Sequence, residues 1–77
     1  MAMDKAQIEA LAEAYKRSDV YWEDAGGNLR NLRGVSATPV DLEGDGMPVP
    51  VAYLESGYID LENVDPQSFV VGQRLFS

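Results

Sequence analysis

The side chains of this sequence that could do chemistry are almost all carboxylates. The 77 residues include thirteen Asp and Glu against six Lys and Arg, with no histidine and no cysteine. Imidazole acid–base catalysis, thiolate nucleophiles and zinc sites built from Cys or His are therefore excluded. Paired-carboxylate chemistry stays open in principle, but so short a chain scarcely builds a deep cleft that excludes water. We expect a protein that is not an enzyme and that holds no cofactor.

The acidic excess is concentrated in one part of the sequence. Residues 1–33 contain six acidic and five basic residues, whereas residues 34–73 contain seven acidic residues and no Lys or Arg. Like charges repel one another and destabilise a compact fold, so this group indicates either a solvated surface or a surface for a basic partner. The seven acids are Asp41, Glu43, Asp45, Glu55, Asp60, Glu62 and Asp65.

Two pairs of these acids have the spacing of one face of a β-strand. Asp41 and Glu43 are two positions apart and alternate with apolar neighbours, and so are Asp60 and Glu62. On a strand, this spacing puts both carboxylates of a pair on the solvent side, about 6.5–7 Å apart. If the two strands share a sheet, four carboxylates share one surface and can imitate the regular phosphates of a nucleic acid.

The pattern predicts a partner with a basic surface, such as a nucleic-acid-binding protein or complex. Opposite electrostatic fields would speed the encounter of the two proteins. Tyr58 shares the outward face of Asp60 and Glu62 by parity, and a tyrosine beside carboxylates can contact Lys or Arg. Direct binding of nucleic acid by this chain is disfavoured, because basic residues such as Arg30 and Arg33 form only small groups and no basic stripe alternates with aromatic residues.

Adjacent aromatic residues supply one more candidate contact. Tyr21 and Trp22 cannot both face inward in a regular element, so we expect one of them to be exposed as an interface anchor. Trp22 is therefore included in the predicted partner-binding surface, together with the seven acids and Tyr58.

One segment resembles the start of a calcium-binding loop. Residues 41–46 read Asp-Leu-Glu-Gly-Asp-Gly, similar to the opening of the D-x-[DN]-x-[DN]-G pattern. However, Ala52 occupies the twelfth position, where a bidentate acid belongs, and Pro48 and Pro50 interrupt the loop. A hairpin turn explains the two glycines equally well, so no metal ligands are assigned.

A helix is predicted over residues 4–17. Asp4 and Gln7 have the spacing of a capping box, and an apolar stripe at helical spacing follows them. Trp22 continues that stripe, which would extend the helix to about residue 24. Residues 20–22 prefer strands instead, so the alternative is a break near Ser18.

Strands and turns are predicted over the sheet region, residues 28–76. We expect a short strand over 28–33, a hairpin of 36–43 with 48–55, a strand over 58–64, a turn or single helical turn at 65–68 and an interior strand over 69–76. The prolines at 48 and 50 indicate an edge strand, or one that begins only at Val51. The fold class is α+β in a single domain over 1–77: a helix, then one small antiparallel sheet of about four strands that could curl toward a barrel.

The chain lacks targeting features. No apolar run approaches the roughly 20 residues of a membrane span, and the first ten residues have neither the basic nor the apolar region of a signal peptide. We therefore expect a cytoplasmic protein that does not bind membranes.

In size and charge the chain is similar to the small acidic inhibitors of phages and mobile elements, such as anti-CRISPR and anti-restriction proteins. That resemblance implies an inhibitor that acts as a nucleic-acid mimic through protein–protein interaction. The alternative is a structural or assembly module, acting as a homo-oligomer such as a homodimer or as an adaptor. Its basis is the thin core of so short a chain and the apolar character of both faces of the last strand.

Overall fold

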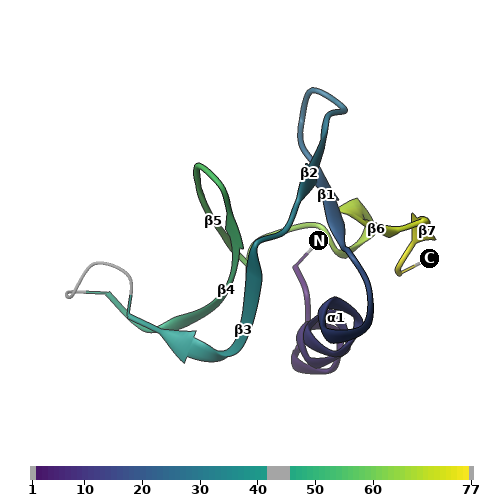
Figure 1. Cartoon of the computed structure of the whole chain (residues 1–77). Coiled ribbons are helices and arrows are strands. Elements are labelled where there is room, and N and C mark those ends of the chain that lie inside the picture. Colours follow the sequence, from purple (N-terminus) through teal and green to yellow (C-terminus); the bar gives the residue numbers. More distant parts are fainter. Residues whose placement is uncertain (1, 42–45, 77) are drawn as a thin grey trace.

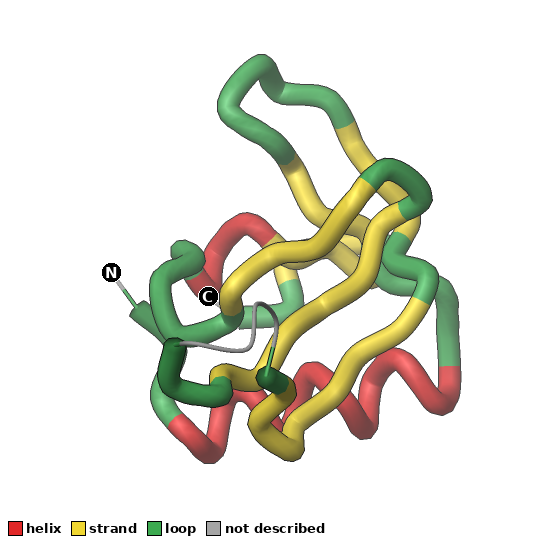
Figure 2. The backbone as a smooth tube through the Cα atoms, turned by 90° about the vertical axis from the view of Figure 1, so that its left-hand side faces the viewer, coloured by secondary structure: helices red, strands yellow, loops and turns green. Residues whose placement is uncertain are grey.

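A computed structural model shows one helix and two small antiparallel sheets (Figures 1 and 2). The structure describes residues 2–41 and 46–76. The predicted α+β class is confirmed. In chain order the elements are α1 (Lys5–Arg17), β1 (Tyr21–Glu23), β2 (Leu29–Asn31), β3 (Gly34–Val40), β4 (Val49–Leu54), β5 (Gly57–Asp60), the 3-10 helix η1 (Pro66–Ser68), β6 (Phe69–Val71) and β7 (Gln73–Arg74).

The start of α1 is fixed by a capping box, as predicted. The Asp4 carboxylate accepts a hydrogen bond from the backbone N–H of Gln7 at 2.8 Å, and the Gln7 side-chain oxygen accepts from the backbone N–H of Asp4 at 3.0 Å. Two N–H groups that no helical carbonyl can reach are thereby satisfied. Met3 and Ile8 flank this box, and both are buried in the core.

The end of α1 settles the two alternatives for the segment that follows it. Ser18 donates its backbone N–H to the carbonyl of Ala14 at 3.0 Å and is itself extended, so the helix ends at Arg17. The predicted break near Ser18 is confirmed, and the extension to residue 24 is wrong. Val20 directly precedes strand β1, and Tyr21 and Trp22 belong to it, in keeping with the strand preference of β-branched and aromatic residues.

The first sheet has the strand order β2-β1-β6-β7, so β1 lies between β2 and β6. The short strand expected over 28–33 is present as β2, which pairs with β1 so that Trp22 lies opposite Arg30. The single interior strand expected over 69–76 is wrong. Gly72 has a φ of 72°, which favours glycine, and the chain reverses there into the antiparallel pair β6 and β7.

The second sheet has the order β3-β4-β5 and contains the predicted hairpin. Its β3–β4 arm pairs residues 34–40 with 49–54, while the turn predicted at Gly44–Gly46 lies mostly outside the described residues. Both alternatives for the proline-containing strand are wrong, since β4 is the central strand and begins at Val49. Pro50 is accommodated because the register shifts between Ser36 and Val40, opposite this proline, so its missing N–H falls at a break in the ladder.

The molecule has two open sheets where one sheet was expected, and neither closes into a barrel in the described part of the chain. The chain passes from one sheet to the other at two consecutive residues between β2 and β3. Leu32 donates its backbone N–H to Val20 of the first sheet at 2.8 Å, and Arg33 donates to Tyr53 of the second sheet at 2.7 Å. No turn separates β2 from β3, so the two strands cannot fold back and pair with each other.

One hydrophobic core joins the helix to both sheets. Leu11 of α1, Leu61 after β5 and Phe69 of β6 are fully buried there. In Figure 1 the β1–β2 and β4–β5 hairpins extend away from α1 and diverge from each other. The remaining buried members of the core are Met3, Ile8, Val20, Leu32, Ala52 and Ile59.

The capping box gives a stability prediction. Asp4→Ala removes the acceptor for Gln7 and should lower the free energy of unfolding by about 1 kcal/mol, a large share of the roughly 3–5 kcal/mol that so small a core supplies. Urea unfolding followed by circular dichroism measures this loss. Asp19→Ala, at an exposed acid beyond the helix, is the control and should change stability by less than about 0.5 kcal/mol. Equal losses in the two variants would contradict the assigned role of Asp4.

Candidate functional site

Two exposed tyrosines stand side by side on the outer face of the β3-β4-β5 sheet. Tyr53 of β4 and Tyr58 of β5 are opposite each other in the register, and 38% and 47% of their surfaces are exposed. Residues opposite each other on neighbouring strands point to the same face. The adjacent pair, Ala52 and Ile59, is buried in the core on the other face, so both tyrosines face outward.

The Tyr53 ring packs over a glycine on the neighbouring strand. Gly34 of β3 lies opposite Tyr53, and a Cβ added to Gly34 would meet the Tyr53 Cδ2 atom at 3.4 Å. The ring therefore covers the glycine, an arrangement that compensates for the missing side chain in the sheet. The pattern of the sequence does not single out Tyr53. The two-residue turn between Leu54 and Gly57 is the signal that would have placed it opposite Tyr58.

Two acidic residues lie close in sequence to these tyrosines. Asp60 lies two residues after Tyr58 on the same strand and therefore on the same face. Glu55 lies in the exposed β4–β5 turn, two residues after Tyr53. No Lys or Arg occurs anywhere in residues 34–73. We call the surface formed by Tyr53, Glu55, Tyr58 and Asp60 the acidic tyrosine face.

The predicted pairing of Asp60 with Glu62 on one strand is wrong. Strand β5 ends at Asp60, not at residue 64, because the Asp60 carboxylate closes a turn. Its Oδ1 atom accepts the backbone N–H of Glu62 at 2.9 Å, and its Oδ2 atom accepts from the Asn63 side chain at 2.8 Å. Leu61 is buried and Glu62 is exposed in this turn. A local hydrogen bond of the Asp side chain thus replaces the strand.

The other predicted acids are separated along the chain. Asp41 directly follows β3 and is exposed, whereas Glu43 and Asp45 lie outside the described residues, as does most of the segment that resembles a calcium loop. Asp65 caps η1, since its Oδ1 atom accepts the backbone N–H of Gln67 at 2.9 Å. Within residues 2–41 and 46–76, no three acidic side chains are arranged to hold a metal ion.

The expectation that either Tyr21 or Trp22 is exposed is wrong. Both residues are half-buried in β1, which has a strand on each side. Trp22 packs against the core and also lines two hollows on the surface. It is the only tryptophan in the chain, so its fluorescence reports on what enters those hollows.

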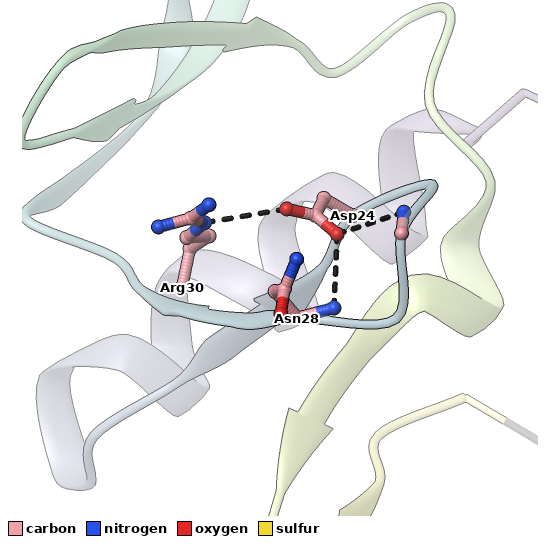
Figure 3. Close-up of polar contacts among 4 residues, drawn as sticks. Asp24, Asn28 and Arg30 are labelled. Carbon is pink, nitrogen blue, oxygen red and sulfur yellow. Dashed lines mark hydrogen bonds and ion pairs between the residues drawn. The ribbon is translucent and has the colours of Figure 1, made fainter.

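The turn between β1 and β2 is organised by one carboxylate (Figure 3). The Asp24 Oδ1 atom accepts the backbone N–H groups of Gly26 and Asn28, each at 2.9 Å, and the Oδ2 atom faces the Arg30 Nε atom at 3.3 Å. The Asn28 hydrogen bond is the main cause that lowers the pKa of Asp24, with Arg30 and Gly26 acting in the same direction. A carboxylate that accepts such bonds is favoured in its charged form.

A groove of about 730 Å³ separates the two diverging hairpins. One wall is strand β2 with the following Arg33, and the other is the end of β4 with its turn, which carries Glu55. Arg30 and Arg33, which lie three positions apart in the sequence, both border this groove. Its lining consists of Trp22, Asp24, Leu29, Arg30, Asn31, Arg33, Leu54, Glu55 and Ser56.

Comparison with protein-family models, with curated proteins and with solved structures gives no match for this chain. No helix in the described residues has both the length and the apolar character needed to cross a bilayer.

The Asp24 turn gives a prediction on pH. Because folding lowers the pKa of Asp24, the stability that its charge contributes is present above its usual value near 3.8 and is lost as the pH falls through the lower folded-state value. Asp24→Asn should therefore be less stable than the wild type at neutral pH, and the difference should shrink in acid. Urea unfolding from pH 7 down to about pH 2 measures this difference. Asp19→Asn is the matched control, and a difference for Asp24→Asn that does not change with pH would contradict the prediction.

Proposed function

We propose that this protein is a non-enzymatic inhibitor that binds a basic surface of a nucleic-acid-binding protein or complex in the cytoplasm. The contact surface is the acidic tyrosine face, and Asp41, Glu62 and Asp65, acids of the same basic-free stretch of the sequence, add to the negative charge of the protein. By occupying a groove that otherwise holds nucleic acid, the protein would exclude the natural ligand. This is the mode of action expected of anti-CRISPR and anti-restriction proteins.

One observation carries this proposal: an exposed tyrosine pair stands on a sheet whose three strands contain no Lys or Arg. Tyr53 and Tyr58 supply flat, rigid contact area of the kind enriched at protein interfaces. Asp60 shares their face and Glu55 borders it, so a Lys or Arg approaching the rings also meets carboxylates. Cation–π contacts and charge pairing would act together on the same basic side chain.

The acids do not form the regular ladder of four carboxylates expected from the sequence, and only Asp60 shares a strand with Tyr58. Asp60 and Asp65 each hold a backbone N–H group in a turn, yet both remain at the surface and keep the field of the sheet negative. The fit to a basic partner therefore depends on the summed field and on the tyrosines, and not on a spacing that copies phosphates. Such an interaction should weaken steeply as salt rises.

The test is capture of partners from a lysate of the host cell with the immobilised wild-type protein at low and high salt. We expect basic nucleic-acid-binding proteins that are retained at low salt and displaced by added DNA or RNA. The variant Glu55→Lys/Tyr58→Ala/Glu62→Lys should lose this retention by about tenfold or more, because it removes both the ring and the charges. Asp60 is left unchanged, since its carboxylate also closes the turn.

A matched control carries the same change of charge elsewhere. Glu13→Lys/Asp19→Lys also converts two acids to lysines, but on α1 and the segment after it, and should retain the partners. Retention that does not depend on salt, or equal loss in both variants, would contradict the proposal. Capture of only the protein itself would instead support the alternative, a homo-oligomeric assembly module.

A further inference from the structure

We propose that the free edge of strand β2 is a second binding site, which accepts an extended peptide segment carrying acidic side chains. The segment would pair with β2 as an added strand, within the groove between the two hairpins. This inference uses a different surface and the opposite charge, so it does not depend on the acidic tyrosine face having a partner.

The backbone of β2 offers hydrogen-bonding groups to such a strand. Leu32 donates to Val20, and Asp24 donates to Asn28. In an antiparallel ladder, hydrogen-bonded residue pairs alternate with pairs that are not hydrogen-bonded. Val20 with Leu32 and Asp24 with Asn28 are hydrogen-bonded pairs, so Trp22 with Arg30, midway between them, is hydrogen-bonded too. The N–H and C=O groups of Arg30 therefore point to β1. Those of its neighbours on β2, residues 29 and 31, point to the open edge of the sheet.

The groove runs along this edge. Leu29, Arg30 and Asn31 are consecutive, and successive side chains of a strand point to opposite faces, yet all three line the same groove. Only a groove that borders the edge can contact residues of both faces. Leu29 is 54% exposed at this site, and Trp22 contributes an aromatic surface to the lining. An entering strand would thus find main-chain partners together with apolar contacts, the combination used in strand addition.

Charge selects the occupant. Arg30 is partly neutralised by Asp24, but Arg33 makes no ion pair with any residue that the structure describes. Both guanidinium groups border the groove on the β2 side, with Glu55 on the opposite wall, and can donate to the carboxylate of an entering strand in a charge-assisted pair. A second copy of this chain fits poorly, because two β2 strands paired about their central residue would place Arg30 opposite Arg30, and like charges in that position are unfavourable. An acidic extended peptide avoids this conflict.

The probe for the test is a blocked seven-residue peptide that alternates Val and Glu, added to the full chain labelled with ¹⁵N. We expect the amide signals of Leu29 and Asn31 to shift and their hydrogen exchange to slow, while the amide of Arg30, already bonded to β1, changes least. Trp22 fluorescence should change with the same concentration dependence. A peptide with Lys in place of Glu should bind more weakly by a factor of about ten or more.

Two pairs of variants separate backbone pairing from charge. Asn31→Pro removes one edge N–H without touching the β1 ladder and should abolish binding, whereas Asn31→Ala keeps that N–H and should bind. Arg33→Glu should weaken binding about tenfold, whereas Arg17→Glu on the helix should not. The dispersion of the amide spectrum shows whether each variant is folded. If Asn31→Pro does not fold, the proposal is still tested by hydrogen exchange at Leu29 and Asn31 of the wild type and by the comparison of Arg33→Glu with Arg17→Glu.

Several outcomes would overturn the proposal. The first is an absence of shifts at Leu29 and Asn31 at millimolar peptide. The second is equal binding of the lysine peptide. The third is a response to a single-stranded oligonucleotide with none to the peptide, which would make the groove a nucleic-acid site. Shifts at the same amides that depend on protein concentration alone would show that a second copy is the occupant.

Discussion

The architecture depends on two consecutive backbone hydrogen bonds at the junction of the sheets. Leu32 donates its backbone N–H to the first sheet and Arg33 donates its own to the second, so two adjacent peptide units join the two sheets. Leu32 is also buried in the core, which fixes the junction against the helix. Because β2 and β3 diverge from this point, their hairpins separate and leave the groove between them. The acidic tyrosine face and the edge of β2 are thus positioned by the same two residues.

Local features of this fold could be predicted from the sequence, whereas its long-range pairings could not. The capping box at Asp4 and the break after the helix involve residues a few positions apart, and their side chains determine the outcome directly. The pairing of β1 with β6 joins distant parts of the chain, and no pattern within residues 20–24 marks it. Without that partner, residues 20–22 could be assigned equally to a helix or to a strand. The division into two sheets depends on the junction at Leu32 and Arg33, whose neighbours fit neither period.

The candidate site was predicted in charge but not in geometry. An acid that alternates with apolar residues has the same pattern whether its carboxylate faces solvent or closes a turn. Asp60 does the latter for the residues that follow it, and this ends the strand on which Glu62 was expected. Tyr58 is exposed, as parity indicated, but its neighbour Tyr53 depends on the register across a turn. Residue type therefore indicated which part of the chain is acidic, and only the fold shows that Tyr53 and Tyr58 stand side by side on the outer face of its sheet.

The two proposed surfaces meet at one turn, and this has an energetic consequence. Glu55 borders the acidic tyrosine face, and it also forms the wall of the groove opposite β2. A basic partner that neutralises Glu55 would leave the arginines of the groove less compensated and so strengthen their attraction for an acidic segment. By linkage, an acidic segment bound at β2 would strengthen binding of the basic partner by the same factor. Either ligand would also stabilise a domain whose own core is thin, because each binds only the folded chain.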